Sequence, residues 1–170
     1  MVACGDADGA ITGNTRRFGA SLDKIKQVVE ARQGEIMFGL NLVVHKGKTI
    51  FVGDTSVHEY PNSEQLAEIA ISAARVVRLF GFDPKVAFVS HSTFGQPLTS
   101  RTKHIKNAVE ILKEKNVDFE FDGDMQPDVA LNQEYEERYP FAKIVGKANI
   151  LIMPGQHSAA ISYKLMKTIG

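Results

Sequence analysis

The chain has 170 residues, the size of one domain or of one domain with a piece of another, and its 44% hydrophobic and 24% charged residues exclude a disordered chain. The formal net charge is zero, which removes the attraction of a basic protein to nucleic acid or anionic lipid and favours self-association. There is a single cysteine, no apolar run long enough to cross a bilayer and no secretory signal, so we expect a soluble, cytoplasmic homo-oligomer with no nucleic-acid or membrane partner.

In the first third of the chain, the sequence predicts a strand, a helix, a second strand and the hairpin partner of that second strand. Residues 7–12 are mainly apolar and predict a strand that enters mid-fold. A helix is expected to begin with Ser21 as its cap and to end at Gly34, because apolar residues recur three and four positions apart. Residues 36–45 predict a buried strand, and residues 49–52 predict its hairpin partner.

The rest of the chain alternates helices and strands. Asn62, with Gln65 three residues later, predicts a capping box that begins a long helix ending at Gly81. Further elements are expected in chain order: a parallel strand at 85–89, a polar loop at 90–98, an amphipathic helix carrying Ile105, Ala108, Val109 and Leu112, a strand at 119–121, an acidic loop at 122–128, a short helix at 127–135, a strand at 150–153, a loop at 154–158 and a last helix at 158–169.

This alternation predicts an α/β fold with a largely parallel sheet flanked by helices, because the connections are too short for anything but βαβ units. Ligands of such sheets bind beyond the carboxyl ends of the strands, which selects the loops at 90–98, 122–128 and 154–158. We also expect a partial fold, because a lone strand and helix at the start of the chain would need a partner to bury both faces.

The loop after residues 85–89 carries hydrogen-bonding side chains and a glycine: Ser90, His91, Ser92, Thr93 and Gly95. Small hydroxyl residues and a glycine let backbone N–H groups approach a phosphate or carboxylate. The same residues are also typical of a strand-to-helix turn in which hydroxyl groups satisfy backbone donors. Either interpretation fits the sequence.

Asp122, Asp124 and Asp128 lie within seven residues, which fits a divalent cation site, a general acid/base pair or, for Asp128, a helix cap. The spacing is not that of an EF-hand, and no metal site is predicted. His91 and His157 are possible proton carriers or hydrogen-bonded structural histidines. The sequence has neither a G-x-G-x-x-G fingerprint nor a P-loop, so a Rossmann nucleotide site is not predicted.

Taken together, several segments resemble the phosphate acetyl/butyryltransferases. They are GDADGAITG, FVGDTSVHEYPNSEQLAEIA, KVAFVSHSTFG, FDGDMQPDVAL and GKANILIMPGQHSAAISYKL, in the family's order. The SHS sequence followed by Phe94-Gly95 is similar to the version found at the C-terminus of bacterial NADP-dependent malic enzymes. Free-standing transferases tend to carry another residue in place of His91.

The resemblance implies a two-domain, isocitrate or isopropylmalate dehydrogenase-like architecture with a cleft for acyl-CoA and acyl phosphate. Residues 1–33 would be the tail of the first domain, and residues 34–170 would be most of the second. The family's serine–arginine pair and its following aspartate would lie beyond the last helix. Asp23 stands where the family has an arginine, which exchanges an anion-binding guanidinium for a carboxylate.

These departures leave the enzymatic status of the segment open and favour a binding role. The first hypothesis is an acetyl-CoA-binding regulatory module of an NADP-dependent malic enzyme, whose catalytic portion would use NADP and Mg²⁺ or Mn²⁺. The second is a fragment of an active phosphate acetyltransferase that moves acetyl between phosphate and CoA. The third is an oligomerisation domain. Candidate acyl-CoA or phosphate ligands are the five residues of the 90–95 loop, the three aspartates and His157.

Overall fold

The computed structural model describes residues 1–31 and 33–169, without the side chain of Arg101, and the chain divides into the compact units Met1–Glu35 and Ile36–Gly170. The first unit holds a 3-10 helix, η1 (Val2–Cys4), and the helix α1 (Phe18–Lys26). The strand predicted at 7–12 is wrong: these residues form no regular element, and no described strand lies beside them to pair with their backbone. The predicted ends of the helix are also wrong, because the chain enters α1 from extended Arg17, and Ser21 lies buried inside it.

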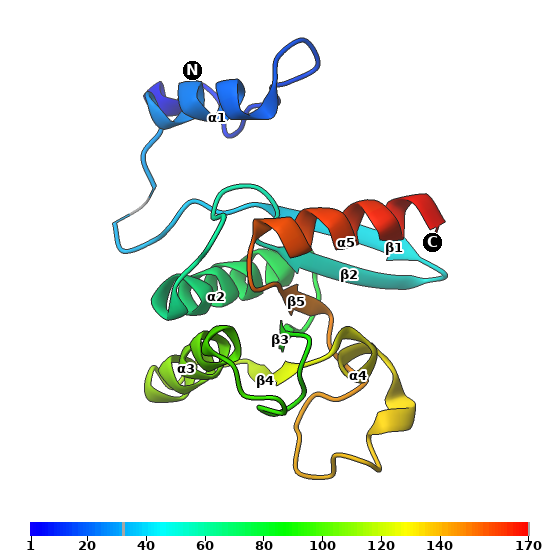
Figure 1. The fold of residues 1–170 in the computed structure, drawn as a ribbon. Coiled ribbons are helices and arrows are strands. Elements are labelled where there is room, and N and C mark those ends of the chain that lie inside the picture. Colours follow the sequence, from blue (N-terminus) through cyan, green and yellow to red (C-terminus); the bar gives the residue numbers. More distant parts are fainter. Residues whose placement is uncertain (32, 170) are drawn as a thin grey trace. The chain divides into compact units, whose positions relative to one another are not determined.

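The second unit is built on a five-stranded sheet, as Figure 1 shows. Its strands, in the spatial order β1-β2-β5-β3-β4, are β1 (Leu40–His45), β2 (Lys48–Gly53), β5 (Ile150–Ile152), β3 (Lys85–Val89) and β4 (Glu120–Met125). Only the β1–β2 hairpin is antiparallel among these pairs, and the pairings β2–β5, β5–β3 and β3–β4 are parallel. The predicted α/β fold with a largely parallel sheet is confirmed.

Two strands differ from the prediction. β1 begins at Leu40 instead of residue 36, and its exposed Leu42 and Val44 make it a half-solvated edge strand, not a buried one. β4 continues through Asp122 and Asp124, which were expected in a loop. Asp122 is paired with Ala87 of β3 in the parallel register, and Asp124 lies at a bulge between the paired residues Gly123 and Met125.

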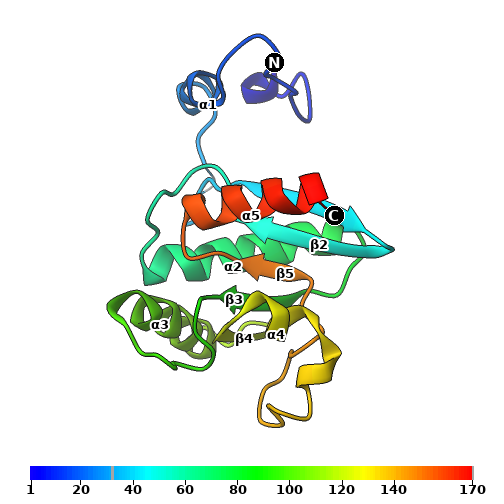
Figure 2. The same ribbon diagram turned by 45° about the vertical axis from the view of Figure 1, so that its right-hand side comes forward.

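Helices cover both faces of the sheet (Figures 1 and 2). α2 (Ser63–Leu79) and α3 (Ser100–Glu114) pack against the face that carries Val86 and Phe88. α4 (Pro127–Leu131), the 3-10 helix η2 (Gln133–Tyr135) and α5 (Gln156–Ile169) follow in the chain, and α4 and α5 pack against the face that carries Ala87 and Val89. This alternation is the two-residue period of a strand buried on both sides.

The helix ends explain why the long helices were predictable. In the capping box of α2, the Gln65 N–H donates to Asn62 Oδ1 at 2.8 Å and the Asn62 N–H donates to Gln65 Oε1 at 2.9 Å, as predicted. Gly81 follows the helix with φ +82°, a conformation that glycine adopts without steric cost. α5 begins at Gln156, two residues earlier than expected. None of the helices in the described part of the chain is long and apolar enough to span a membrane.

Candidate functional site

The carboxyl ends of β2, β3, β4 and β5 lie at one edge of the sheet, because these four strands run parallel. Three of the loops at this edge were predicted. The fourth, residues 54–62, was missed because β2 was interpreted only as the return strand of a hairpin. Its parallel pairing with β5 turns its end toward the predicted loops. The edge therefore has four loops from which a ligand site can be built.

Asp124 ties the loop after β3 to the end of β4. Its carboxylate is 1% exposed and accepts hydrogen bonds from the Ser92 hydroxyl through Oδ2 and from the Gly95 N–H, at 2.8 Å, through Oδ1. The Ser92 N–H donates to Ser90 Oγ at 3.2 Å, so both buried serines belong to the same network. The polar residues predicted after β3 are thus held in place by one of the aspartates predicted after β4.

Two further residues of the predicted loop meet the backbone and side chain of Gln126. The Gln126 N–H donates to Thr93 Oγ1 at 3.3 Å, and its side-chain amide donates to the His91 carbonyl at 3.0 Å. The His91 side chain is exposed. Hydrogen bonds therefore hold residues 91–95 of this loop against the end of β4 and Gln126. The Ser92 hydroxyl donates to Asp124, and the Ser90 hydroxyl contacts that of Ser92.

Asp54, which the sequence reasoning missed, organises the loop after β2 in the same way. It is 2% exposed, and its Oδ1 accepts from the N–H groups of Gly39 (2.8 Å), Ser56 (2.9 Å) and Val57 (3.1 Å). Its Oδ2 accepts from the His58 N–H at 2.8 Å and lies 2.7 Å from His58 Nδ1. The available signal was the Gly-Asp pair, which spans the end of β2 as Gly53-Asp54 and comes just before the last residue of β4 as Gly123-Asp124.

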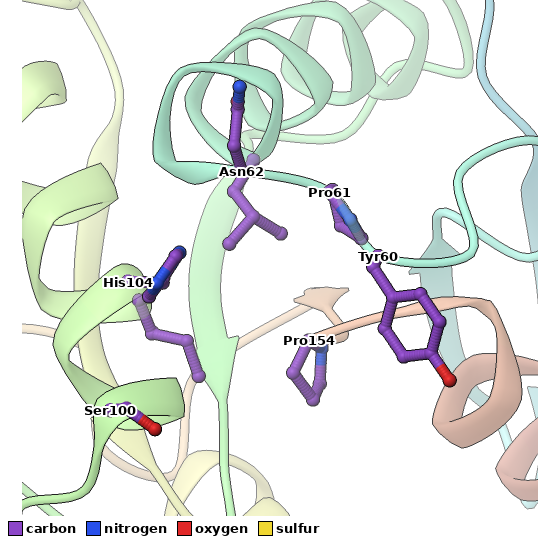
Figure 3. A pocket seen from close by; sticks show the side chains of 8 residues that line it. Tyr60, Pro61, Asn62, Ser100, His104 and Pro154 are labelled. Carbon is purple, nitrogen blue, oxygen red and sulfur yellow. The ribbon is translucent and has the colours of Figure 1, made fainter.

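A cavity of about 240 Å³ opens between these loops. The beginnings of α2 and α3, the end of the loop before α2 and the loop after β5 form its wall, and Figure 3 shows their side chains around the open centre. The lining residues are Tyr60, Pro61, Asn62, Leu66, Ser100, His104, Ile105 and Pro154. Prolines and aliphatic side chains make one part of the wall apolar, whereas Ser100 and His104 bring a hydroxyl and an imidazole that can form hydrogen bonds.

The remaining predicted residues are His157, Asp122 and Asp128, and none of the three lines this cavity. His157 is in the first turn of α5; its ring is stacked on Tyr60 with centroids 6.4 Å apart, and its Nε2 lies 3.4 Å from Glu59 Oε1. Asp122 accepts from the Lys143 N–H at 3.0 Å. Asp128 is exposed in the first turn of α4, where it makes no side-chain cap in the described structure.

The structure does not support a cation site at the three aspartates. Among the described residues, no three His, Cys, Asp or Glu side chains are grouped as a metal ion would require. The oxygens of Asp124 already accept protein N–H and O–H groups. Direct contact between any predicted site residue and a ligand stays a prediction. What the geometry provides is a pre-shaped edge with a small, partly apolar cavity.

Comparison with known proteins agrees with this layout. The family model described as "Phosphate acetyl/butaryl transferase" matches residues 1–170. The NADP-dependent malic enzyme of Rhizobium meliloti is 44% identical over 170 residues, which are 100% of this chain and 22% of that protein. The phosphate acetyltransferase of Bacillus subtilis is 30% identical over 100% of this chain and 53% of its own length.

A solved structure extends the agreement to the fold. The phosphotransacetylase from Streptococcus pyogenes superposes with a TM-score of 0.92 at 28% identity, over 99% of this chain and 53% of that one. The chain therefore spans about half the length of these two transferases and about a fifth of the length of the malic enzyme.

Proposed function

This chain belongs to the phosphate acetyl/butaryl transferase family, and we propose that it serves as an acetyl-CoA-binding regulatory module of an NADP-dependent malic enzyme. The observation that carries the proposal is the cavity at the carboxyl edge of the sheet, whose wall is apolar in one part and hydrogen-bonding in another. A short acyl thioester has this same combination of a small apolar group and a polar carbonyl.

The malic-enzyme context rests on the extent of the match. Relatives named NADP-dependent malic enzyme from Rhizobium meliloti and Escherichia coli are 44% and 36% identical over essentially the whole of this chain. In that context malate would be oxidised and decarboxylated elsewhere in the longer protein. The present chain would alter that reaction by binding acetyl-CoA with different affinities in two states.

Asp23 supports a role in binding over catalysis. It is exposed on α1, at the position where the family resemblance places an arginine. A guanidinium would bind a phosphate through two parallel hydrogen bonds, whereas a carboxylate repels it. We also propose that residues 1–33 and 34–170 belong to the two domains of an isocitrate dehydrogenase-like architecture, a division supported by the two compact units.

The second candidate is an active phosphate acetyltransferase, favoured by the close superposition on a phosphotransacetylase. Two measurements separate the candidates. Calorimetric titration with acetyl-CoA tests binding, and release of free CoA thiol from acetyl-CoA and phosphate tests transfer. We expect binding without transfer, together with inhibition of NADPH formation from malate in the longer protein. Transfer at enzymatic rates would favour the second candidate, and no heat at millimolar acetyl-CoA would leave only a role in assembly.

The cavity itself is tested by His104→Ala, with His45→Ala as the matched control. His104 lines the cavity, whereas His45 ends β1 at the opposite edge of the sheet. Loss of one hydrogen bond to the ligand weakens binding about five-fold. We expect this change in the acetyl-CoA affinity of H104A and none in H45A; equal affinities in the two variants would place the ligand elsewhere.

A further inference from the structure

A hollow of about 490 Å³ lies at the amino edge of the sheet, opposite to the carboxyl edge and its cavity. The strands β2, β5 and β3 are parallel and their arrows point the same way in Figure 2, so the residues at which they begin lie together. We call this space the lysine hollow. Its volume is in the range of sites for small ligands. Its polar lining residues include Lys48, Asp83, Lys85, Gln133, Lys147 and Asn149.

Hydrogen bonds and close backbone packing fix the floor of the lysine hollow. Asn149 Oδ1 accepts from the Lys85 N–H at 2.8 Å, and the Asn149 side-chain amide donates to the Asp83 carbonyl at 2.7 Å. On the other side of the hollow, a Cβ at Gly146 would lie 2.5 Å from the Gln133 Cα, so the chain before β5 lies directly against η2. The backbone around the hollow is therefore pre-organised, and a ligand would need to order only side chains.

The lysine hollow concentrates positive charge in a chain whose formal net charge is zero. Its lining includes Lys48, Lys85 and Lys147, whereas Asp83 is the one acidic residue among the described lining residues. Lys48 is exposed, and no carboxylate in the described part of the chain forms an ion pair with it. A local excess of ammonium groups attracts an anionic ligand.

The other two lysines have carboxylate partners that a ligand can replace. Lys147 Nζ lies 3.1 Å from Glu136 Oε1, and Lys85 Nζ lies 3.5 Å from Glu120 Oε2. The two glutamate side chains are 40% and 53% exposed. Exposed ion pairs contribute little to stability, because water and salt screen them. A monoanion would gain no more from each lysine than these glutamates do, whereas an anion with several charged oxygens can contact more than one lysine at once.

The type of cation in the hollow indicates the type of anion. An arginine binds a planar carboxylate through two parallel hydrogen bonds, and the described lining residues include no arginine. A lysine ammonium is a point charge with rotatable donors, and several of them can surround the oxygens of a phosphoryl group. We propose that the lysine hollow binds a phosphorylated small molecule that carries more than one negative charge. The inference does not rest on the proposed function, because the acetyl-CoA site is assigned to the opposite edge of the sheet.

Calorimetric titration of the 170-residue chain with inorganic pyrophosphate tests the site. The variants are Lys48→Gln and Lys147→Gln, with Lys164→Gln as the matched control, because Lys164 is exposed on α5 and does not line the hollow. We expect K48Q and K147Q to bind pyrophosphate about five-fold more weakly and K164Q to match the wild type. Glu136→Gln should bind it about two- to five-fold more tightly, because Lys147 then has no carboxylate partner to give up.

Amide chemical shifts locate the bound anion. We expect pyrophosphate to shift the amides of Lys48, Lys147 and Asn149 and to leave unchanged those of Asn62 and Ser100, which line the cavity at the other edge. Malate and inorganic phosphate carry similar charges at neutral pH, so a comparison of the two separates a dicarboxylate from a phosphoryl group. Phosphate should shift the amides of the hollow at a lower concentration than malate does.

Other outcomes overturn the inference. Unchanged pyrophosphate affinity in K48Q and K147Q would refute the site, and an equal loss in K164Q would reduce it to general attraction by surface lysines. Shifts confined to Asn62 and Ser100 would place the anion in the cavity instead. Malate that shifts the amides of the hollow at the same concentration as phosphate, or at a lower one, would overturn the assignment to phosphorylated ligands. Each of these failures leaves the proposed function intact, because that function is tested with acetyl-CoA.

Discussion

Replacing Asp124 with alanine tests whether buried carboxylates hold the loops at the carboxyl ends of the parallel strands in place. The side chain is 1% exposed and accepts one hydrogen bond from Ser92 and one, at 2.8 Å, from the Gly95 N–H. A buried hydrogen bond to a charged group contributes about 1.5–3 kcal/mol, and its loss leaves the donor unsatisfied. We therefore expect D124A to lower the free energy of unfolding by about 3–5 kcal/mol, a large part of the stability of an ordinary domain.

The chain supplies a matched control two residues away on the same strand. Asp122 is half-exposed, and its carboxylate accepts from the Gly123 N–H at 2.9 Å and the Lys143 N–H at 3.0 Å, where water can replace it. D122A should cost about 1 kcal/mol or less. D124N, which keeps one acceptor oxygen, should fall between the two alanine variants.

Urea denaturation with linear extrapolation measures the three free energies, and amide hydrogen exchange of Gly95 gives a local reading. D124A should exchange this amide faster than the wild type, and D122A should not. A D124A protein that is no less stable than D122A, or a Gly95 amide that keeps its protection without the carboxylate, would show that Asp124 does not hold this loop.

Three further changes extend the test to other parts of the fold. Leu112→Ala removes a fully buried side chain and should cost about 2–5 kcal/mol in urea denaturation, whereas Leu79→Ala, 83% exposed, should stay within about 0.5 kcal/mol; equal effects would contradict the assigned core. Gly146→Ala places a Cβ 2.5 Å from backbone atoms at φ +69°, so the melting temperature should fall; an unchanged value would refute the close contact. Asp54→Ala should cost about 3–5 kcal/mol and Glu59→Ala, on an exposed side chain, about 1 kcal/mol at most; similar losses would count against the Asp54 network.

The sequence predicted the central elements because their signals are local. The capping box at Asn62, the apolar stripe of α2 and the β-branched run of β3 each lie within a few turns of chain. Edge elements were predicted less well. β1 was expected to be buried because it is apolar, yet strand order places it at an edge of the sheet, and strand order depends on pairings between distant residues.

The candidate site shows the same limit. Ser90, Ser92 and Asp124 were each singled out, but their hydrogen-bonded network joins residues 32 positions apart, which no local spacing reveals. Asp54 was missed because a lone aspartate after a strand resembles an ordinary turn residue. Only the five contacts to its carboxylate distinguish it.

The two aspartate networks also constrain how regulation by this chain would operate. Loops that are already tied down lose little conformational freedom when a ligand arrives, so the edge is pre-organised for binding. Regulation requires a different element with two states, whose equilibrium the ligand shifts. Loosening a loop by D124N should therefore weaken acetyl-CoA binding and leave unchanged the maximal inhibition of malate oxidation at saturating acetyl-CoA in the longer protein. A variant that keeps the affinity but loses the maximal inhibition would place the two-state element in these loops.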